Sequence, residues 1–194
     1  PVVWTITADI PNEEVIDGYK IVDPLDSRLD YVSTSVTLAD GTPLLSTDYV
    51  VSFDEATNTV TVQFTAAGLL VLADHTDTQV VVVINTTVNE IGEIENVAYV
   101  YPNEYSFDIE PGEPGGPTPT DPVDTKWGQI TIEKVGENSE TLSGAQFQVF
   151  TSLADAQAQT NPVVIDGVSV WTSDANGVLT IDGLRYSGWA DGEA

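Results

Sequence analysis

The stretch VVWTITAD, residues 2–9, shows most clearly the pattern that decides the fold. Large apolar residues stand at every second position, Val2, Trp4 and Ile6, with valine or threonine between them. Because successive side chains of a strand point to opposite faces, this period of two predicts a β-strand with one buried face. Valine and threonine dominate the whole chain, and both suit a pleated, half-buried surface. The sequence therefore predicts an all-β protein.

Similar short segments fill the first 110 residues at the spacing of a β-sandwich. Turn-forming residues separate them, for example at 41–43 and 54–58. Residues 66–74 predict one short helix, and the unbroken run at 78–88 predicts a strand buried on both faces. The strands expected here are 2–9, 18–23, 29–38, 48–53, 59–65, 78–88, 94–101 and 104–109.

Residues 111–126, PGEPGGPTPTDPVDTK, divide the chain. Proline fixes φ and lacks a backbone donor, so this stretch cannot be a central strand and is predicted to be a semi-rigid Pro/Gly linker. It separates a first sandwich, residues 1–110, from a second, residues 127–194. In the second we expect strands at 129–135, 145–150, within 163–172 and at 178–181, and a helix at 152–159 capped by Ser152.

Charge narrows the function. The 194 residues include 31 Asp and Glu against five Lys and Arg, a net charge of −26. Such a field repels phosphate backbones and anionic lipid surfaces, so neither nucleic acid nor membrane is an expected partner. It favours cation binding or basic partners, although a simple repulsive, solvated surface explains it as well. No apolar run approaches the roughly 20 residues of a membrane helix.

The sequence lacks the residues and motifs that most kinds of enzymatic catalysis require. There is no cysteine, hence no disulfide and no thiolate ligand. His75 is the only histidine, which excludes the usual zinc sites and leaves a Ser-His-Asp triad only through this residue. No Gly-x-Ser-x-Gly, phosphate-binding or EF-hand motif occurs, and the many carboxylates give a glycosidase pair no specific support. We therefore expect no cofactor and no enzymatic turnover, and no motif indicates a metal site, although calcium held by clustered carboxylate oxygens is an alternative.

Lys134 is unusual for a β-sandwich. Period two places it on the same face as Ile130 and Ile132. A lysine on an apolar face is costly unless it is paired or neutral. The alternative is a lysine at the end of a strand whose ammonium reaches solvent.

Asp23 and Asn96 are a second such feature. Asp23 shares a strand face with Tyr19 and Ile21, and Asn96 shares one with Ile94. A carboxyl and an amide on inward faces need hydrogen-bond partners. Ordinary buried hydrogen bonding is one explanation.

Another explanation is chemical, because one known reaction uses all three residue types. A neutral, desolvated lysine amine can attack the carboxamide carbon of asparagine while a protonated carboxylic acid polarises the amide and carries protons. Burial lowers the pKa of the amine and raises that of the acid. The product is an isopeptide cross-link, formed once with loss of ammonia.

Both modules contain segments that resemble known domains. The second resembles the start of a CnaB-type pilin domain, and the first resembles a CnaA-like fimbrial isopeptide-forming domain. Their tandem order is similar to that of SpaA-type backbone pilins of Gram-positive bacteria. The matching segments are 4–6, 9–11, 19–25, 29–31 and 94–98 in the first module and 127–135, 142–150 and 172–184 in the second.

The resemblance implies two immunoglobulin-like (Cna-type) β-sandwiches, the second incomplete, and a role for each unusual residue. Lys134 matches the cross-linking lysine of the CnaB domain. Asn96 matches the amide partner of the first domain, and Asp23 matches its catalytic acid. We expect the lysine of the first domain upstream of Pro1, and the acid and asparagine of the second beyond Ala194.

The function implied is that of a shaft subunit of a pilus on the Gram-positive cell wall. Sortase would join such subunits covalently, and internal isopeptide bonds would take the place of disulfides. A tip or basal pilin, or a wall-anchored adhesin that binds a host or surface ligand, is the alternative. A wall-associated glycosidase is a third and weaker one.

Overall fold

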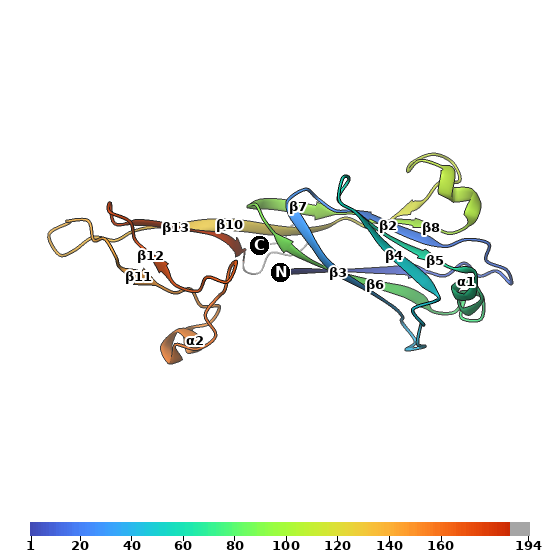
Figure 1. The fold of residues 1–194 in the computed structure, drawn as a ribbon, viewed down its shortest axis with the longest axis horizontal. Coiled ribbons are helices and arrows are strands. Elements are labelled where there is room, and N and C mark those ends of the chain that lie inside the picture. Colours follow the sequence, from blue (N-terminus) through green and yellow to red (C-terminus); the bar gives the residue numbers. More distant parts are fainter. Residues whose placement is uncertain (187–194) are drawn as a thin grey trace. The chain divides into compact units, whose positions relative to one another are not determined.

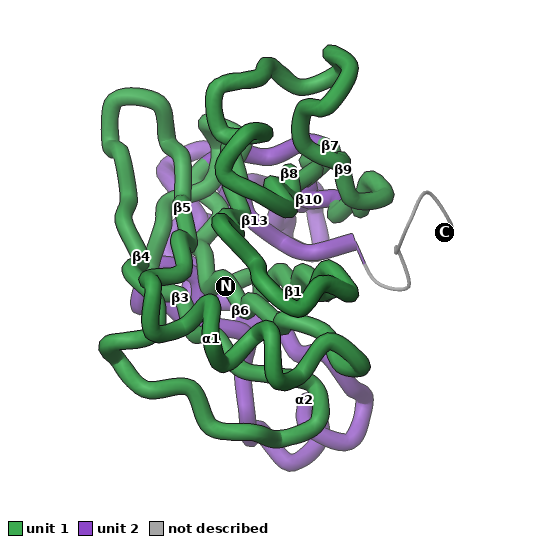
Figure 2. The backbone as a smooth tube through the Cα atoms, turned by 90° about the vertical axis from the view of Figure 1, so that its right-hand side faces the viewer, with its two compact units in different colours: residues 1–89, 93–125, 188–194 green, residues 90–92, 126–187 purple. Residues whose placement is uncertain are grey.

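The computed structural model describes residues 1–186. They form two compact units, one of residues 1–89 and 93–125 and one of residues 90–92 and 126–186 (Figure 2). Strands dominate both units, as predicted. None of the helices described is long and apolar enough to cross a membrane.

The first unit contains two antiparallel sheets (Figure 1). One has the order β1-β6-β3 and the other the order β4-β5-β2-β8-β9. The strands of these two sheets are β1 (Val2–Asp9), β2 (Lys20–Pro24), β3 (Leu29–Leu38), β4 (Tyr49–Asp54), β5 (Thr59–Phe64), β6 (Gln79–Val88), β8 (Tyr99–Tyr101) and β9 (Thr118–Pro119). Strand β7 (Gly92–Asn96) precedes β8 in the chain and belongs to neither of them.

The alternation in β1 has the predicted consequence. Val2, Trp4 and Ile6 are buried, whereas the residues between them are exposed. The indole Nε1 of Trp4 donates to Thr86 Oγ1 at 3.0 Å, which satisfies its one polar group inside the core. The prediction that residues 78–88 are buried on both faces is wrong. Buried and half-buried residues alternate along β6, because an antiparallel sheet can keep one face near solvent.

Other local predictions had mixed outcomes. Helix α1 (Ala66–Ala73) forms where expected and is capped by Thr65, whose hydroxyl accepts from the Gly68 N–H. The strand expected at 104–109 is a 3₁₀ helix instead, η1 (Glu104–Asp108). Asn103 explains the difference, since its side chain accepts from the Ser106 N–H at 2.9 Å and so caps a helical turn.

The segment expected to be a linker is partly strand. β9 pairs with β8 at the edge of the larger sheet, and Thr120 extends the pairing because its N–H donates to the Ala98 carbonyl at 2.8 Å. The Ala98 N–H donates in return to Thr120 Oγ1 at 3.1 Å. Pro119 fits this position because an edge strand tolerates a missing donor. Residues 118–120 therefore belong to the first sandwich, and β10 (Val123–Glu133) begins before residue 127.

The second unit is built on the antiparallel pair of β10 and β13 (Val178–Arg185). β11 (Gln146–Phe147) and β12 (Trp171–Thr172) form a second, short pair. The strand expected at 145–150 is therefore shorter than predicted, and β12 is the strand expected within 163–172. Helix α2 (Leu153–Ala158) has Ser152 as its N-cap, as predicted. The buried apolar side chains described in this unit are Trp127, Leu179 and Ile181.

Gly177 gives a test of the second unit. It closes a turn with φ of +76°, and an added Cβ would lie 2.6 Å from the carbonyl oxygen of Lys134. We expect Gly177→Ala to lower the free energy of unfolding by about 1–2 kcal/mol for the left-handed backbone and by roughly 1–3 kcal/mol more for the clash. Denaturant unfolding followed by the fluorescence of Trp127 and Trp171 measures the loss.

Gly144→Ala is the matched control, because Gly144 has φ of +75° but no atom within 4 Å of its added Cβ. It carries the backbone cost alone. Equal losses in the two variants would show that the close approach at Lys134 is unimportant.

Candidate functional site

Asp23 and Asn96 meet inside the first unit. Asp23 lies on β2 with Tyr19 and Ile21 on the inward face, as period two predicts, and Lys20 faces outward. Asn96 ends β7. Only 1% of Asp23 and 4% of Asn96 is exposed, and Asn96 Nδ2 donates to Asp23 Oδ2 at 2.9 Å. The structure thus brings together two residues that are 73 positions apart.

The surroundings of this pair are apolar. Asp23 lies opposite Val60 of β5. The buried Ile21 is two positions from Asp23 on the same strand, and the buried Ile94 is two positions from Asn96 on its strand. Oδ1 of Asp23 and Oδ1 of Asn96 are buried and accept no hydrogen bond from any described residue. Unpartnered buried polar atoms are rare in folded proteins and are often found where chemistry takes place.

Burial changes the acidity of Asp23. Desolvation raises the pKa of its carboxyl from 3.8 to about 6, and the hydrogen bond from Asn96 opposes that rise in part. A carboxylic acid with a pKa close to neutral can exchange a proton near physiological pH, as general acid–base catalysis requires. An acid and an amide in contact in an apolar interior can therefore activate the amide carbon toward a nucleophile.

Lys134 lies in the second unit, just beyond β10. The face it shares with Ile130 is not buried, since Ile130 is 46% exposed. Its Nζ donates to the Val135 carbonyl at 3.1 Å. The environment is that of a lysine at a strand end with its ammonium near solvent, the simpler of the two explanations. Its role as a cross-linking residue stays a prediction.

Sequence reasoning missed the surroundings of Lys20. Its Nζ lies 4.2 Å from the ring centroid of Tyr101 and 4.4 Å from that of Phe107. Burial lowers the pKa of this amine, and the charge of Asp108 opposes the effect. The cross-strand register, Lys20 opposite Tyr101, is what positions the amine, and no local pattern in the sequence indicates that register.

Comparison with known proteins gives consistent matches. The family described as SpaA, prealbumin-like fold domain, matches residues 128–190. Fimbrial subunit type 2 of Actinomyces naeslundii is 31% identical over 190 residues, which cover 87% of this chain and 35% of the relative.

Solved pilin structures match both units. The full-length major pilin SpaD of Corynebacterium diphtheriae is 30% identical with a TM-score of 0.77, over 98% of this chain and 48% of that one. The Actinomyces fimbrial adhesin FimA is 29% identical with a TM-score of 0.67, over 93% of this chain and 70% of that one. The chain thus spans about a third of the curated relative and about half of SpaD.

The fold, with an acid and an amide buried between the strands of its first unit, is that of the sandwich modules of pilins. The family match and the similar structures agree with the sequence resemblance to SpaA-type pilins.

Proposed function

We propose that the chain is part of a shaft subunit of a sortase-assembled pilus on the Gram-positive cell surface. The observation that carries the proposal is the similarity to the major pilin SpaD along 98% of the chain, through both units. The role is structural and extracellular, with other pilin subunits as partners. Sortase would make the covalent links between subunits, and attachment to the cell wall would follow.

We further propose that the first unit forms an internal isopeptide bond at Asn96, with Asp23 as the acid. The buried pair, its 2.9 Å hydrogen bond and the raised pKa of Asp23 support this role. None of the described lysines hydrogen-bonds to either side chain, so the amine would come from a lysine outside residues 1–186. Lys134 would be the corresponding lysine of the second unit.

The reaction would take place once in each molecule. The neutral amine of lysine attacks the carboxamide carbon of Asn96. For this step the Asn96 amide turns its oxygen, which accepts no hydrogen bond in the described structure, toward protonated Asp23, which then donates to it and polarises the carbonyl. A C–N bond to the lysine forms and the C–N bond to the amide nitrogen breaks. Asp23 carries a proton from the attacking amine to the departing nitrogen, so that one ammonia leaves and the acid is regenerated.

Incubation of the intact protein with a class of sortase that polymerises pilins tests the shaft role. We expect a ladder of covalent multimers, seen by denaturing electrophoresis, that disappears when sortase is omitted. A protein that never joins to further copies of itself, and is linked to other pilins through one end only, would contradict a shaft role.

One observation favours a second candidate function. FimA, similar in both units, is described as a fimbrial adhesin. A tip pilin or wall-anchored adhesin that binds a host or surface ligand is therefore the alternative. It predicts adhesion by the isolated protein together with no multimer ladder.

A further inference from the structure

Two cavities meet at the end of β1. Asp9 and Ile10 line both of them, so they are adjacent. One is mostly polar and the other mostly apolar, both lie within the first unit, and neither Asp23 nor Asn96 lines either of them. The proposed pilin chemistry uses neither of them.

The apolar cavity has a volume of about 390 Å³. It lies between the end of β1 and the β8–β9 edge of the other sheet. Residues of β1 line one side of it, and Val100, Pro102 and Pro119 line the other. A space of this size can take one or two aliphatic side chains.

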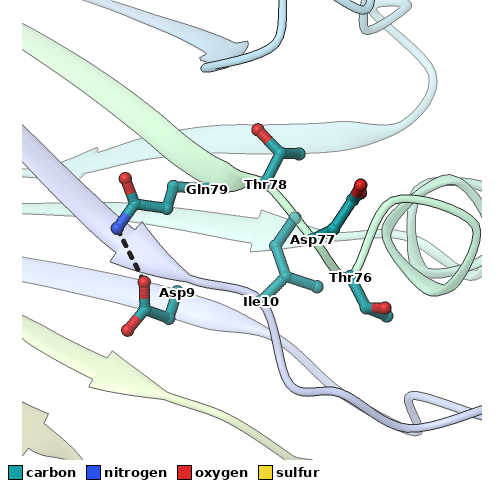
Figure 3. Close-up of a pocket in the computed structure, with 6 residues that line it drawn as sticks. All are labelled: Asp9, Ile10, Thr76, Asp77, Thr78 and Gln79. Atoms are coloured by element: carbon teal, nitrogen blue, oxygen red, sulfur yellow. Dashed lines mark hydrogen bonds between the residues drawn. The ribbon is translucent and has the colours of Figure 1, made fainter.

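The polar cavity has a volume of about 510 Å³ and two carboxylates at its rim. Figure 3 shows Ile10 between Asp9 on one side and Asp77 on the other, with Asp9 joined to Gln79. Gln79 Nε2 donates to Asp9 Oδ1 at 2.6 Å. Asp9 and Asp77 are both exposed, and within residues 1–186 neither carboxylate forms an ion pair with Lys or Arg.

The backbone that leads to these cavities is a strand edge, closed at its end where the Tyr19 hydroxyl donates to the Asp9 carbonyl oxygen at 2.8 Å. β1 is the outer strand of the order β1-β6-β3 and pairs with β6 alone in the described structure. The neighbouring edge strand β9 carries Pro119, which blocks pairing, but β1 has no proline or lysine along its length. An edge without such protection can pair with an added strand.

We propose that the end of β1 binds an extended, basic segment of a partner protein. The segment pairs with the edge of β1 before Asp9, places apolar side chains in the cavity beside β8 and β9, and places lysine or arginine beside the exposed carboxylate of Asp9, where Asp77 adds to the negative charge. A net charge of −26 attracts such a segment. The five basic residues of this chain are spread so widely that no two lie within seven positions, so residues 1–194 do not themselves contain such a segment.

The test is a titration of the purified protein with short capped peptides. The first peptide alternates valine and lysine, which places valine on one face of a strand and lysine on the other. A serine–lysine peptide has the same charge without the apolar face, and a peptide with its valines and lysines in separate blocks lacks the alternation. We expect the alternating peptide to bind about tenfold more tightly than either, from the burial of its aliphatic groups.

Variants then locate the site. Asp9→Asn and Asp77→Asn should each weaken binding by about three- to tenfold, with less dependence on salt. Glu55→Gln is the matched control, because Glu55 is exposed, carries the same charge and lines neither cavity. Amide shifts on peptide addition should concentrate in residues 7–11 and 118–120.

Three outcomes would overturn the proposal. The first is no binding of the alternating peptide. The second is equal binding of the alternating and serine–lysine peptides, which reveals bulk attraction only. The third is equal weakening by Asp9→Asn, Asp77→Asn and Glu55→Gln.

Discussion

Replacing Asp23 with asparagine should stop cross-linking at Asn96 in the intact protein. Asparagine keeps the size of the side chain and can still accept the hydrogen bond that Asn96 Nδ2 donates at 2.9 Å, but it cannot exchange a proton. General acid–base catalysis contributes about 10²- to 10⁴-fold to such reactions, so a bond that forms during folding should become slow or undetectable. Intact-mass measurement should show the Asp23→Asn protein retaining one ammonia that the parent has lost.

Two variants complete this experiment. Asn96→Ala removes the amide carbon, and its digest should lack the branched lysine–asparagine peptide found in the parent. Glu95→Gln, on the exposed face of β7 beside Asn96, removes a carboxylate without touching the pair and should leave the cross-link intact. A parent protein with no ammonia loss and an unbranched Asn96 peptide would refute the proposed bond, whatever the variants do.

The sequence predicted the burial of Asp23 and Asn96 because both residues lie on strands with clear alternation. Period two put Asp23 with Tyr19 and Asn96 with Ile94 on inward faces, and all four are buried. Contact between Asp23 and Asn96 could not be derived from periodicity, because it depends on how strands far apart in sequence pair and pack. Only the family resemblance connected the two residues.

Lys134 shows where the same reasoning fails. Alternation assigns it to a face with Ile130, but it cannot say whether another layer covers that face. Ile130 is 46% exposed, so the face is open in the described structure.

The prediction of a strand at 104–109 failed for a local reason, since the Asn103 cap stabilises a helical turn over apolar residues that also suit a strand. β9 was missed because it comprises two residues, with a proline, and is held by its partner β8 rather than by its own pattern.

The buried acid should also make the first unit less stable as pH rises. The pKa of Asp23 in the folded chain is about 6, against 3.8 for the exposed group, so folding favours the protonated form. Its contribution is fully present below about pH 4 and is lost as pH rises through about 6. The difference between the two pKa values corresponds to about 3 kcal/mol of unfolding free energy.

Other carboxylates complicate the parent curve, because acid also relieves the repulsion of a chain with net charge −26. The informative quantity is therefore the difference in unfolding free energy between Asp23→Asn and the parent, both as residues 1–194 and measured by denaturant unfolding. Asparagine cannot ionise. The unfolding free energy of the variant, relative to that of the parent, should therefore rise by about 3 kcal/mol as the pH increases from 4 to 7.5. Glu95→Gln, whose parent carboxylate is exposed, should show no such change across the range. A flat difference for Asp23→Asn would mean that Asp23 ionises as easily inside the folded chain as in water, and a carboxyl of that kind could not serve as the proton donor at Asn96.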